Sequence, residues 1–153
     1  MSTKTEIKLL EDLAFEEKKK KYPDQPYLIK KRFSDKSANE LTKAIIAFIK
    51  LNGGQAERIS NTGRVIDGRK TYTDVLGHRR EIGSIQWIPS TGTAGTADIS
   101  ATINGQSVKI EVKHGRDRQS EAQKRYQAEV ERAGGIYFVA KDFESFYQWY
   151  HQK

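Results

Sequence analysis

The chain has 153 residues, a formal net charge of +7 and no cysteine, so it can form one domain with a hydrophobic core but neither disulfides nor thiolate metal sites. No stretch approaches the ~18 consecutive apolar residues of a membrane-spanning helix, and the N-terminus lacks the apolar region of a signal peptide, so we expect an intracellular protein without a membrane partner. The excess of lysine and arginine favours a polyanionic partner such as nucleic acid.

Residues 1–34 are predicted to form a basic helical extension. A helix is expected from Thr5 to about Lys21, because apolar residues recur on one side of it and prolines follow its end. The helix ends in four consecutive lysines, which either contact phosphates or are solvated charges that complement the helix dipole. The segment is expected to pack on the domain or on a second subunit.

A second helix is predicted to begin at Ser37 and to end at Asn52. Ser37 and Glu40 have the spacing of a capping box, and two glycines follow Asn52. The apolar side of this helix consists of residues three or four positions apart, namely Leu41, Ala44, Ile45, Phe48 and Ile49. Glu40 lies at the edge of that side, where capping is its simplest role.

Between residues 55 and 95 the sequence predicts two strands joined by a basic segment. Residues 55–67 and 84–88 have the composition of strands. Residues 64–83 are polar and basic, which leaves two interpretations: a hairpin arm that touches a nucleic-acid backbone, or a solvent-exposed connection. Residues 89–95 form a loop of small residues, which allows close backbone approach next to Asp98.

The central feature of the sequence is a hairpin predicted over residues 96–113. Asn104-Gly105 is typical of a two-residue type I′ turn, and both arms are rich in β-branched residues. This turn places apolar pairs on one face of the hairpin: Ala97 with Val112, Ile99 with Ile110, and Ala101 with Val108. The other face is polar, with Asp98 opposite Glu111 at a Cβ separation of ~5 Å and Lys113 one pair further along.

Two carboxylates in facing positions repel each other unless something compensates their charge. A divalent cation that accepts oxygen ligands from Asp98 and Glu111 would do so, and oxygen ligands suit Mg²⁺, with Mn²⁺ able to substitute. The alternative is an exposed amphipathic hairpin whose acids are solvated.

A third helix is predicted from about Ser120 to Ala133, followed by a buried strand at 136–140 and a last helix after Asp142. Ser120 and Gln123 form a second capping box. The aromatic residues of the last helix are expected to pack in the core. The order of elements predicts an α/β fold with a mixed central sheet flanked by helices, and no repeat or second domain is visible.

The segments Gly95-Thr-Ala-Asp98, Glu111-Val-Lys113, Gln123 and the run from Ala133 to Val139 resemble the VRR-NUC family of the PD-(D/E)XK nuclease superfamily. The resemblance covers about residues 37–150, and residues 58–63 are similar to a further element of that family. Thr96-Ala97 stand where many members have proline or serine before the aspartate. The resemblance implies a restriction-endonuclease-like αβββαβ core in residues 35–153, and a stand-alone cytoplasmic protein of the bacterial or phage type.

The function expected from these residues is metal-dependent endonuclease hydrolysis of DNA. Asp98 and Glu111 would hold one or two Mg²⁺ ions with the backbone carbonyl of Val112, and Lys113 would orient the attacking water or meet the scissile phosphate. The resemblance implies that Glu40 points towards the metal site and that Gln123 lies on its rim. It also implies a homodimer that cleaves branched DNA such as four-way (Holliday) junctions.

Two other classes of function compete with this one. A catalytically silent module would use the nuclease fold to hold nucleic acid or a protein partner, but it has no need to keep Asp98, Glu111 and Lys113 together. A structural or assembly protein would explain the basic N-terminal segment but not the facing carboxylates.

Overall fold

The protein is described by a computed structural model over residues 3–60 and 62–153. The chain forms two compact units. The first, Met1–Ile59 with Ala94–Lys153, is called the sheet unit below, and the second, Ser60–Thr93, is called the ribbon.

The sheet unit is built on a four-stranded sheet. Its strands are β1 (Gln55–Arg58), β6 (Ile99–Ile103), β7 (Gln106–Val112) and β8 (Ile136–Ala140), in the order β1-β6-β7-β8. β7 and β8 are parallel, whereas the other neighbours are antiparallel. The helices are α1 (Thr3–Lys21), α2 (Ala38–Leu51), α3 (Glu121–Arg132) and α4 (Phe143–His151). The prediction of an α/β fold with a mixed central sheet and flanking helices is therefore confirmed.

The hairpin of β6 and β7 has the predicted turn and register. Asn104 and Gly105 have φ values of 50° and 77°, as a type I′ turn requires at both central positions. The ladder runs from Ile103 opposite Gln106 to Ile99 opposite Ile110. All six residues of the predicted apolar face are buried, from Ala97 to Val112.

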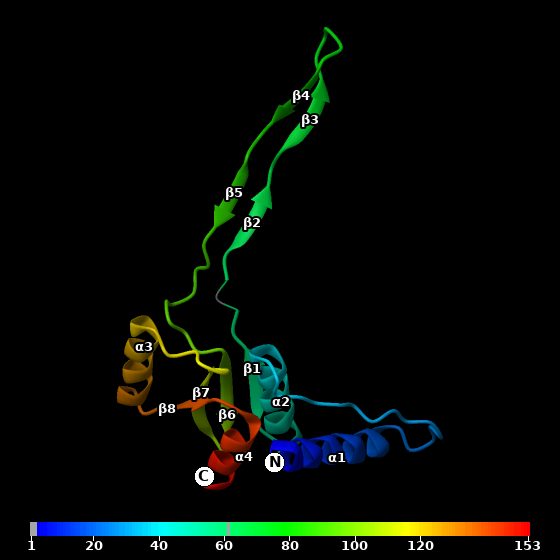
Figure 1. Cartoon of the computed structure of the whole chain (residues 1–153), viewed down its shortest axis with the longest axis vertical. Coiled ribbons are helices and arrows are strands. Elements are labelled where there is room, and N and C mark those ends of the chain that lie inside the picture. Colours follow the sequence, from blue (N-terminus) through cyan, green and yellow to red (C-terminus); the bar gives the residue numbers. More distant parts are fainter. Residues whose placement is uncertain (1–2, 61) are drawn as a thin grey trace. The chain divides into compact units, whose positions relative to one another are not determined.

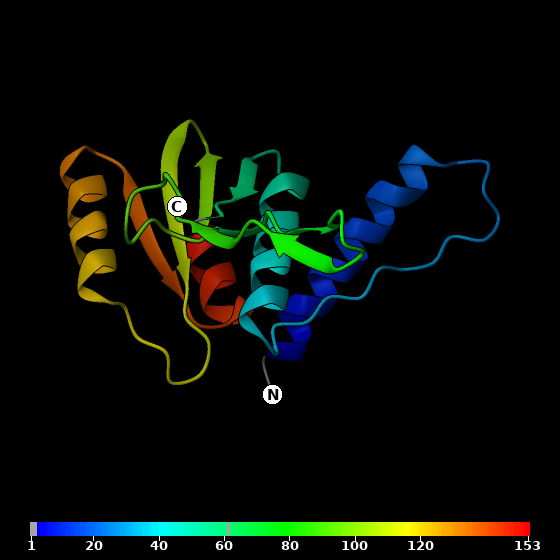
Figure 2. The ribbon, with the colours of Figure 1, turned by 90° about the horizontal axis from the view of Figure 1, so that it is seen from above.

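Helices cover both faces of this sheet (Figure 2). α2 and α4 pack on the apolar face, and α3 packs beside β8 on the polar face. The core is rich in aromatic rings: Phe48 of α2 meets Phe143 and Phe146 of α4 edge to face, at centroid distances of 5.7 and 5.9 Å. This confirms the expected core role of the α4 aromatics.

The N-terminal helix belongs to the sheet unit rather than standing apart from it. α1 packs against α2 and α4, and its Leu10 is fully buried in the core. The chain returns along α1, where the buried carboxylate of Glu11 accepts hydrogen bonds from Arg32 and from the backbone of Phe33. The segment 1–34, which was expected to pack on the domain or on a second subunit, thus packs on the domain. The second compact unit is the ribbon.

The single strand predicted over residues 55–67 is two strands, and this expectation is corrected. β1 ends at Arg58, and the next backbone N–H, that of Ile59, donates to the carbonyl of Asp98. The chain then changes partner, because β2 (Arg64–Asp67) pairs within the ribbon with β5 (Ile85–Ile88). Asn61, part of the family-like element 58–63, lies outside the described residues.

The ribbon is a long two-stranded hairpin (Figure 1). Beyond β2 and β5 it continues as β3 (Lys70–Thr73) and β4 (Arg79–Ile82), in the same register, to a turn at residues 74–78. Asp74 stabilises the turn by accepting from the backbone N–H groups of Leu76 and His78. Residues 64–83 thus form a hairpin, as the first interpretation expects, and its strands are exposed, as the second expects. Contact with nucleic acid stays a prediction.

Within the described residues, no helix combines the length and the apolar character needed to cross a membrane.

Candidate functional site

The centre of the candidate site is the carboxylate of Glu111, in the middle of the sheet. Glu111 is only 2% exposed, and it lies on the polar face of β7 beneath α3. Its Oε1 accepts a hydrogen bond from the side-chain amide of Gln123 and lies 3.1 Å from Nζ of Lys113. Its Oε2 is buried and has no hydrogen-bond partner among the described residues. The acid is therefore not simply solvated.

The pKa of Glu111 is raised above its ordinary value. Burial is the main cause, and the negative charge of Asp98 adds to it, while the ammonium of Lys113 acts in the opposite direction. Burial without full compensation disfavours the charged form of a carboxyl group. A further positive charge beside Glu111 would thus be favourable.

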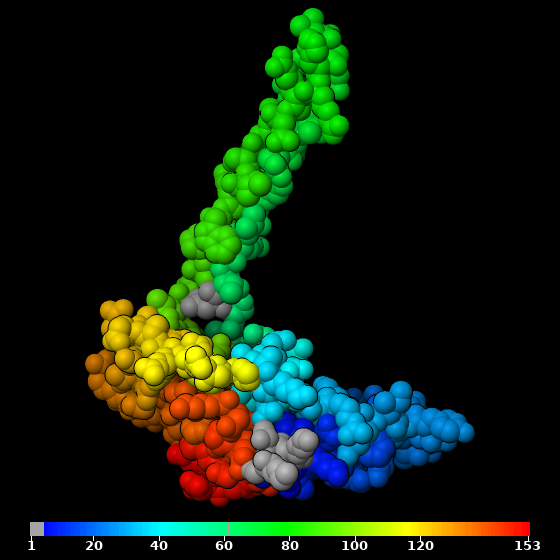
Figure 3. Space-filling view, viewed as in Figure 1, coloured from blue at the N-terminus to red at the C-terminus, as the bar shows by residue number. Residues whose placement is uncertain are grey.

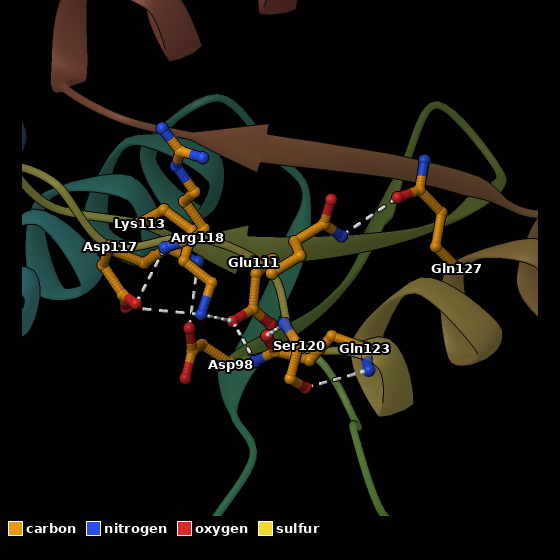
Figure 4. A network of polar contacts seen from close by, with 10 residues as sticks. Asp98, Glu111, Lys113, Asp117, Arg118, Ser120, Gln123 and Gln127 are labelled. Carbon is orange, nitrogen blue, oxygen red and sulfur yellow. Dashed lines mark hydrogen bonds and ion pairs between the residues drawn. The ribbon is translucent and has the colours of Figure 1, made fainter.

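Asp98 approaches Glu111 from the start of β6 (Figure 4). The ladder ends at Ile99 opposite Ile110, so Asp98 is one residue beyond it rather than paired with Glu111 in the ladder as predicted. Its backbone carbonyl accepts from Ile59, and its Oδ2 accepts from the N–H of Val112 at 2.9 Å. The side chain of Asp98, and not its backbone, therefore accepts the hydrogen bond of the Val112 N–H. The negative charge of Asp98 is nevertheless one of the causes that raise the pKa of Glu111, and both side chains belong to the same network of polar contacts (Figure 4).

Lys113 follows β7 and completes a charged trio with Glu111 and Asp117. Its backbone N–H donates to Ala140, which fixes the residue at the end of the strand. Its ammonium lies 3.1 Å from Glu111 Oε1 and 3.3 Å from Asp117 Oδ2, with 9% of the side chain exposed. Burial acts against the charged form, but hydrogen bonds and charges from both acids outweigh it and raise the pKa of Lys113.

Gln123 caps α3 and also contacts the buried carboxylate of the candidate site. Its side-chain oxygen accepts from the N–H of Ser120 at 2.9 Å, and its backbone N–H donates to the Ser120 hydroxyl, which completes the predicted capping box. The nitrogen of the same side-chain amide donates to Glu111. The start of α3 is thus tied directly to the buried carboxylate (Figure 4).

Gly95 lets the loop before Asp98 pack against the start of α3. Its φ is +80°, and a Cβ at this position would lie 2.4 Å from the backbone of Ala122 and 2.6 Å from the nitrogen of Gln123. The close backbone approach expected for the small residues of this loop is therefore present.

A scan against models of protein families found no match to this chain. A comparison with curated proteins found no match either.

Glu40 and Val112 have local partners in the structure. The Glu40 carboxylate accepts from the hydroxyls of Ser34 and Ser37 at 3.2 and 3.1 Å, and its backbone N–H bonds to Ser37. Among the described residues, none of its hydrogen bonds reaches Asp98 or Glu111. Only the Ser37 half of the predicted capping box is seen there, because the Glu40 carboxylate contacts the Ser37 hydroxyl and not the Ser37 backbone N–H. A part for Glu40 in the metal site, and for the carbonyl of Val112 as a ligand, stays a prediction.

Two residues near the site were not predicted from the sequence. Asp117 lies in the turn after β7, where its contact with Lys113 depends on the path of the turn. Tyr137 lies within an apolar run, yet it is on β8 opposite Lys109, and its pKa is raised mainly by burial and then by the charge of Glu111. The parallel register of β7 and β8, which no local pattern predicts, brings this phenol near the acid.

The carboxylates fit a hard divalent cation. No group of three or more potential metal-binding His, Cys, Asp or Glu side chains occurs in the part of the chain that the structure describes. Mg²⁺, however, is commonly held by one or two carboxylates while it keeps several waters. The buried, unpartnered Oε2 of Glu111 is the oxygen that such an ion would satisfy, and the negative charge of Asp98 acts on the same carboxyl group.

Proposed function

We propose that this protein is a metal-dependent deoxyribonuclease that hydrolyses phosphodiester bonds, with the restriction-endonuclease-like core of the VRR-NUC family. The observation that carries the proposal is the buried carboxylate of Glu111, which has one unpartnered oxygen, a second carboxylate beside it and a lysine at 3.1 Å. The order α2, β1, β6, β7, α3, β8 agrees with the αβββαβ order that the resemblance implies.

Asp98 and Glu111 would hold Mg²⁺ or Mn²⁺ through oxygen atoms. When bound, the ion lowers the pKa of a coordinated water and offsets the charge that builds up on the phosphate. Lys113 would supply an ammonium donor to the attacking water or to a phosphate oxygen. Asp117 holds Lys113 from the solvent side, and Gln123 fixes the rotamer of Glu111.

DNA is proposed as the substrate because of the charge near the site. Cations surround the turn after β7 and the first turns of α3, at Arg116, Arg118, Lys124 and Arg125. Such a cluster suits the phosphate backbone, which dominates the affinity of proteins for nucleic acid. Branched DNA such as a four-way junction, and a homodimer that cleaves it, are proposed on the resemblance alone.

A panel of single-stranded, duplex, flap and four-way-junction DNA, incubated with Mg²⁺ or Mn²⁺, tests the proposal. We expect cleavage of at least one substrate by the wild type, and none by Asp98→Asn. Undiminished cleavage by Asp98→Asn would refute the site, and a wild type that cuts no DNA with either ion would refute the activity.

A silent module that binds nucleic acid is the second candidate. It is favoured by the contacts of Glu111 Oε1 with Lys113 and Gln123, which stabilise that oxygen without any metal. On this alternative the wild type binds DNA but does not cut it, and Mg²⁺ leaves the melting temperature unchanged.

A further inference from the structure

The ribbon has two faces with different residues. In an antiparallel pair, opposed residues share a face, and successive pairs point to opposite sides. Because one register runs through both halves of the ribbon, odd-numbered residues lie on one face and even-numbered residues on the other. The ion pairs agree, since Arg69 contacts Asp67 at 2.7 Å and Glu81 at 3.9 Å, and all three residues are odd-numbered.

On the odd-numbered face, acidic and basic side chains balance each other. Asp67 accepts two hydrogen bonds from the guanidinium of Arg69, and Glu81 is the second acid near it. The remaining cation on this face is Arg79, so that two arginines stand against two acids between residues 64 and 88. This face offers no excess charge to a polyanion.

The even face is cationic. It carries Arg64, Lys70 and Arg80, and its one acid is Asp74 in the turn. The carboxylate of Asp74 is already engaged, because it accepts from two backbone N–H groups of the turn and lies 3.0 Å from Nε of Arg80. Arg64 and Lys70 are exposed and form no ion pair within the described residues.

Exposed apolar and aromatic side chains lie between these cations. Tyr72 is opposite Arg80 and is 48% exposed, and Ile82, opposite Lys70, is 55% exposed. The ribbon is narrow, and its side chains lie in the open along its length (Figure 3). A cationic face with an interleaved ring and aliphatic groups suits the phosphates of a duplex and apolar contact with base edges in its grooves.

We propose that the even-numbered face of the ribbon binds double-stranded DNA, with Arg64 and Lys70 on phosphates. This inference rests on the proposed function, which identifies the polyanion as DNA. The major groove of B-DNA admits a two-stranded β-ribbon. The extended chain from Arg64 to Asp74 covers about 33 Å at the rise of a strand, which matches the ~34 Å of one duplex turn.

A second copy of the chain fits this face less well. A symmetric dimer places the same surface of both copies in contact, so the cations of one even face would meet those of the other. Like charges across an interface oppose association. DNA provides the opposite charge on both sides of its grooves.

The test is the affinity of the full-length protein for a labelled duplex, measured by fluorescence anisotropy in EDTA over a range of salt concentrations. The variant is Arg64→Gln with Lys70→Gln, and each single change is measured as well. Arg79→Gln is the matched control, because it removes one exposed arginine from the odd face of the same ribbon. The amide NMR signals of Leu76 and His78, which donate to Asp74, report that the ribbon is folded.

We expect the double variant to reduce the slope of log affinity against log salt by about 1.8, the value for two lost phosphate contacts. Arg79→Gln should leave the slope unchanged. Equal slopes for wild type, double variant and control would overturn the proposal. So would an even-face variant that changes the sedimentation coefficient but not DNA binding, because the face would then bind a second copy.

Cleavage assays separate this inference from the proposed function. If the wild type binds duplex DNA through Arg64 and Lys70 but cuts none, the nuclease proposal fails and the ribbon inference stands. If the wild type cuts DNA and the double variant binds and cuts equally well, the ribbon inference fails and the nuclease proposal stands.

Discussion

The side-chain amide of Gln123 joins two parts of the candidate site, since its oxygen caps α3 at Ser120 and its nitrogen donates to the buried carboxylate of Glu111. The position of α3 and the rotamer of the acid are therefore set by one side chain. A residue that links a helix start to a buried acid can affect the site without binding metal or substrate.

Gln123→Glu separates the two roles of this amide. Glutamate at this position is a good partner in a capping box, so the helix should be retained. The new carboxylate, however, would lie beside Glu111, where a like charge disfavours ionisation. We expect a lower melting temperature without metal, a larger increase on addition of Mg²⁺ and weaker DNA cleavage. Glu129→Gln, a change at an exposed residue later in the same helix that forms no ion pair among the described residues, is the control and should alter none of these.

Metal binding should be visible in the stability of the protein. A ligand that binds only the folded state stabilises it by an amount that grows with its concentration. We expect Mg²⁺ or Mn²⁺ to raise the melting temperature of the wild type in differential scanning fluorimetry, and Asp98→Asn to lose most of this shift. An equal shift in Asp98→Asn and wild type would place the ion elsewhere.

Gly95 and Gly105 provide a matched pair for testing the close approach of the Asp98 loop to α3. Both have φ near +80°, so alanine costs on the order of 1 kcal/mol or more in backbone strain at either position. Only at Gly95 does a Cβ meet backbone atoms, at 2.4 Å, whereas at Gly105 nothing lies within 4 Å. Gly95→Ala should therefore lower the free energy of unfolding more than Gly105→Ala, and it alone should impair cleavage. If urea denaturation gave equal losses in the free energy of unfolding for the two variants, the close approach of Gly95 to α3 would not be required for stability.

The hairpin of β6 and β7 could be predicted from the sequence because its determinants are local. Asn104-Gly105 sets the turn, and the alternation of apolar residues sets the buried face. The position of Asp98 was predicted less well, because its carboxylate takes the Val112 N–H in place of a ladder partner. The prediction of one strand over 55–67 was wrong for a similar reason. The strand-like sequence continues from β1, which pairs with β6, into β2, which pairs with β5, and this change of partner depends on distant residues.

Burial was the other property that the sequence did not reveal. Glu111 looks like a polar residue of an exposed face, yet α3 and β8 cover it. The neighbouring Tyr137 looks like part of an apolar strand, yet it lies beside the acid. Both facts follow from the parallel pairing of β7 with β8, which brings together segments that are far apart in sequence.

The turn of the ribbon should depend on pH. Hydrogen bonds from His78, Arg80 and Leu76 lower the pKa of Asp74 below its ordinary value. A lowered pKa in the folded state means that the stabilisation is present above the unfolded pKa, near 3.9, and is lost as the pH falls through the folded value. The amide signals of Leu76 and His78 should therefore lose their hydrogen-bonded shifts on acidification, and Asp74→Asn should shift or remove the transition. Signals that stay constant down to pH 2 would contradict this.

Lys113→Ala separates an enzyme from a silent module. The ammonium of Lys113 lies against a carboxylate that is almost fully buried, so its removal leaves Glu111 without its cation and should lower the melting temperature in EDTA. Mg²⁺ should restore most of this loss, because the ion supplies the missing positive charge. The rate constant for cleavage, measured under saturating single-turnover conditions, should nevertheless fall about 100-fold or more, which is the effect of one lost transition-state donor.

Lys109→Ala is the matched control for this change, because Lys109 lies on the same face of β7 and its Nζ donates to Ser100 instead of to the acids. We expect Lys109→Ala to keep wild-type turnover, and Glu111→Gln to lose turnover and Mg²⁺-induced stabilisation together. DNA affinity should change little in Lys113→Ala, since one cation of many is removed. If the wild type cuts no DNA and Lys113→Ala binds DNA as the wild type does, Lys113 serves only to neutralise Glu111, and the silent module is the better description of the protein.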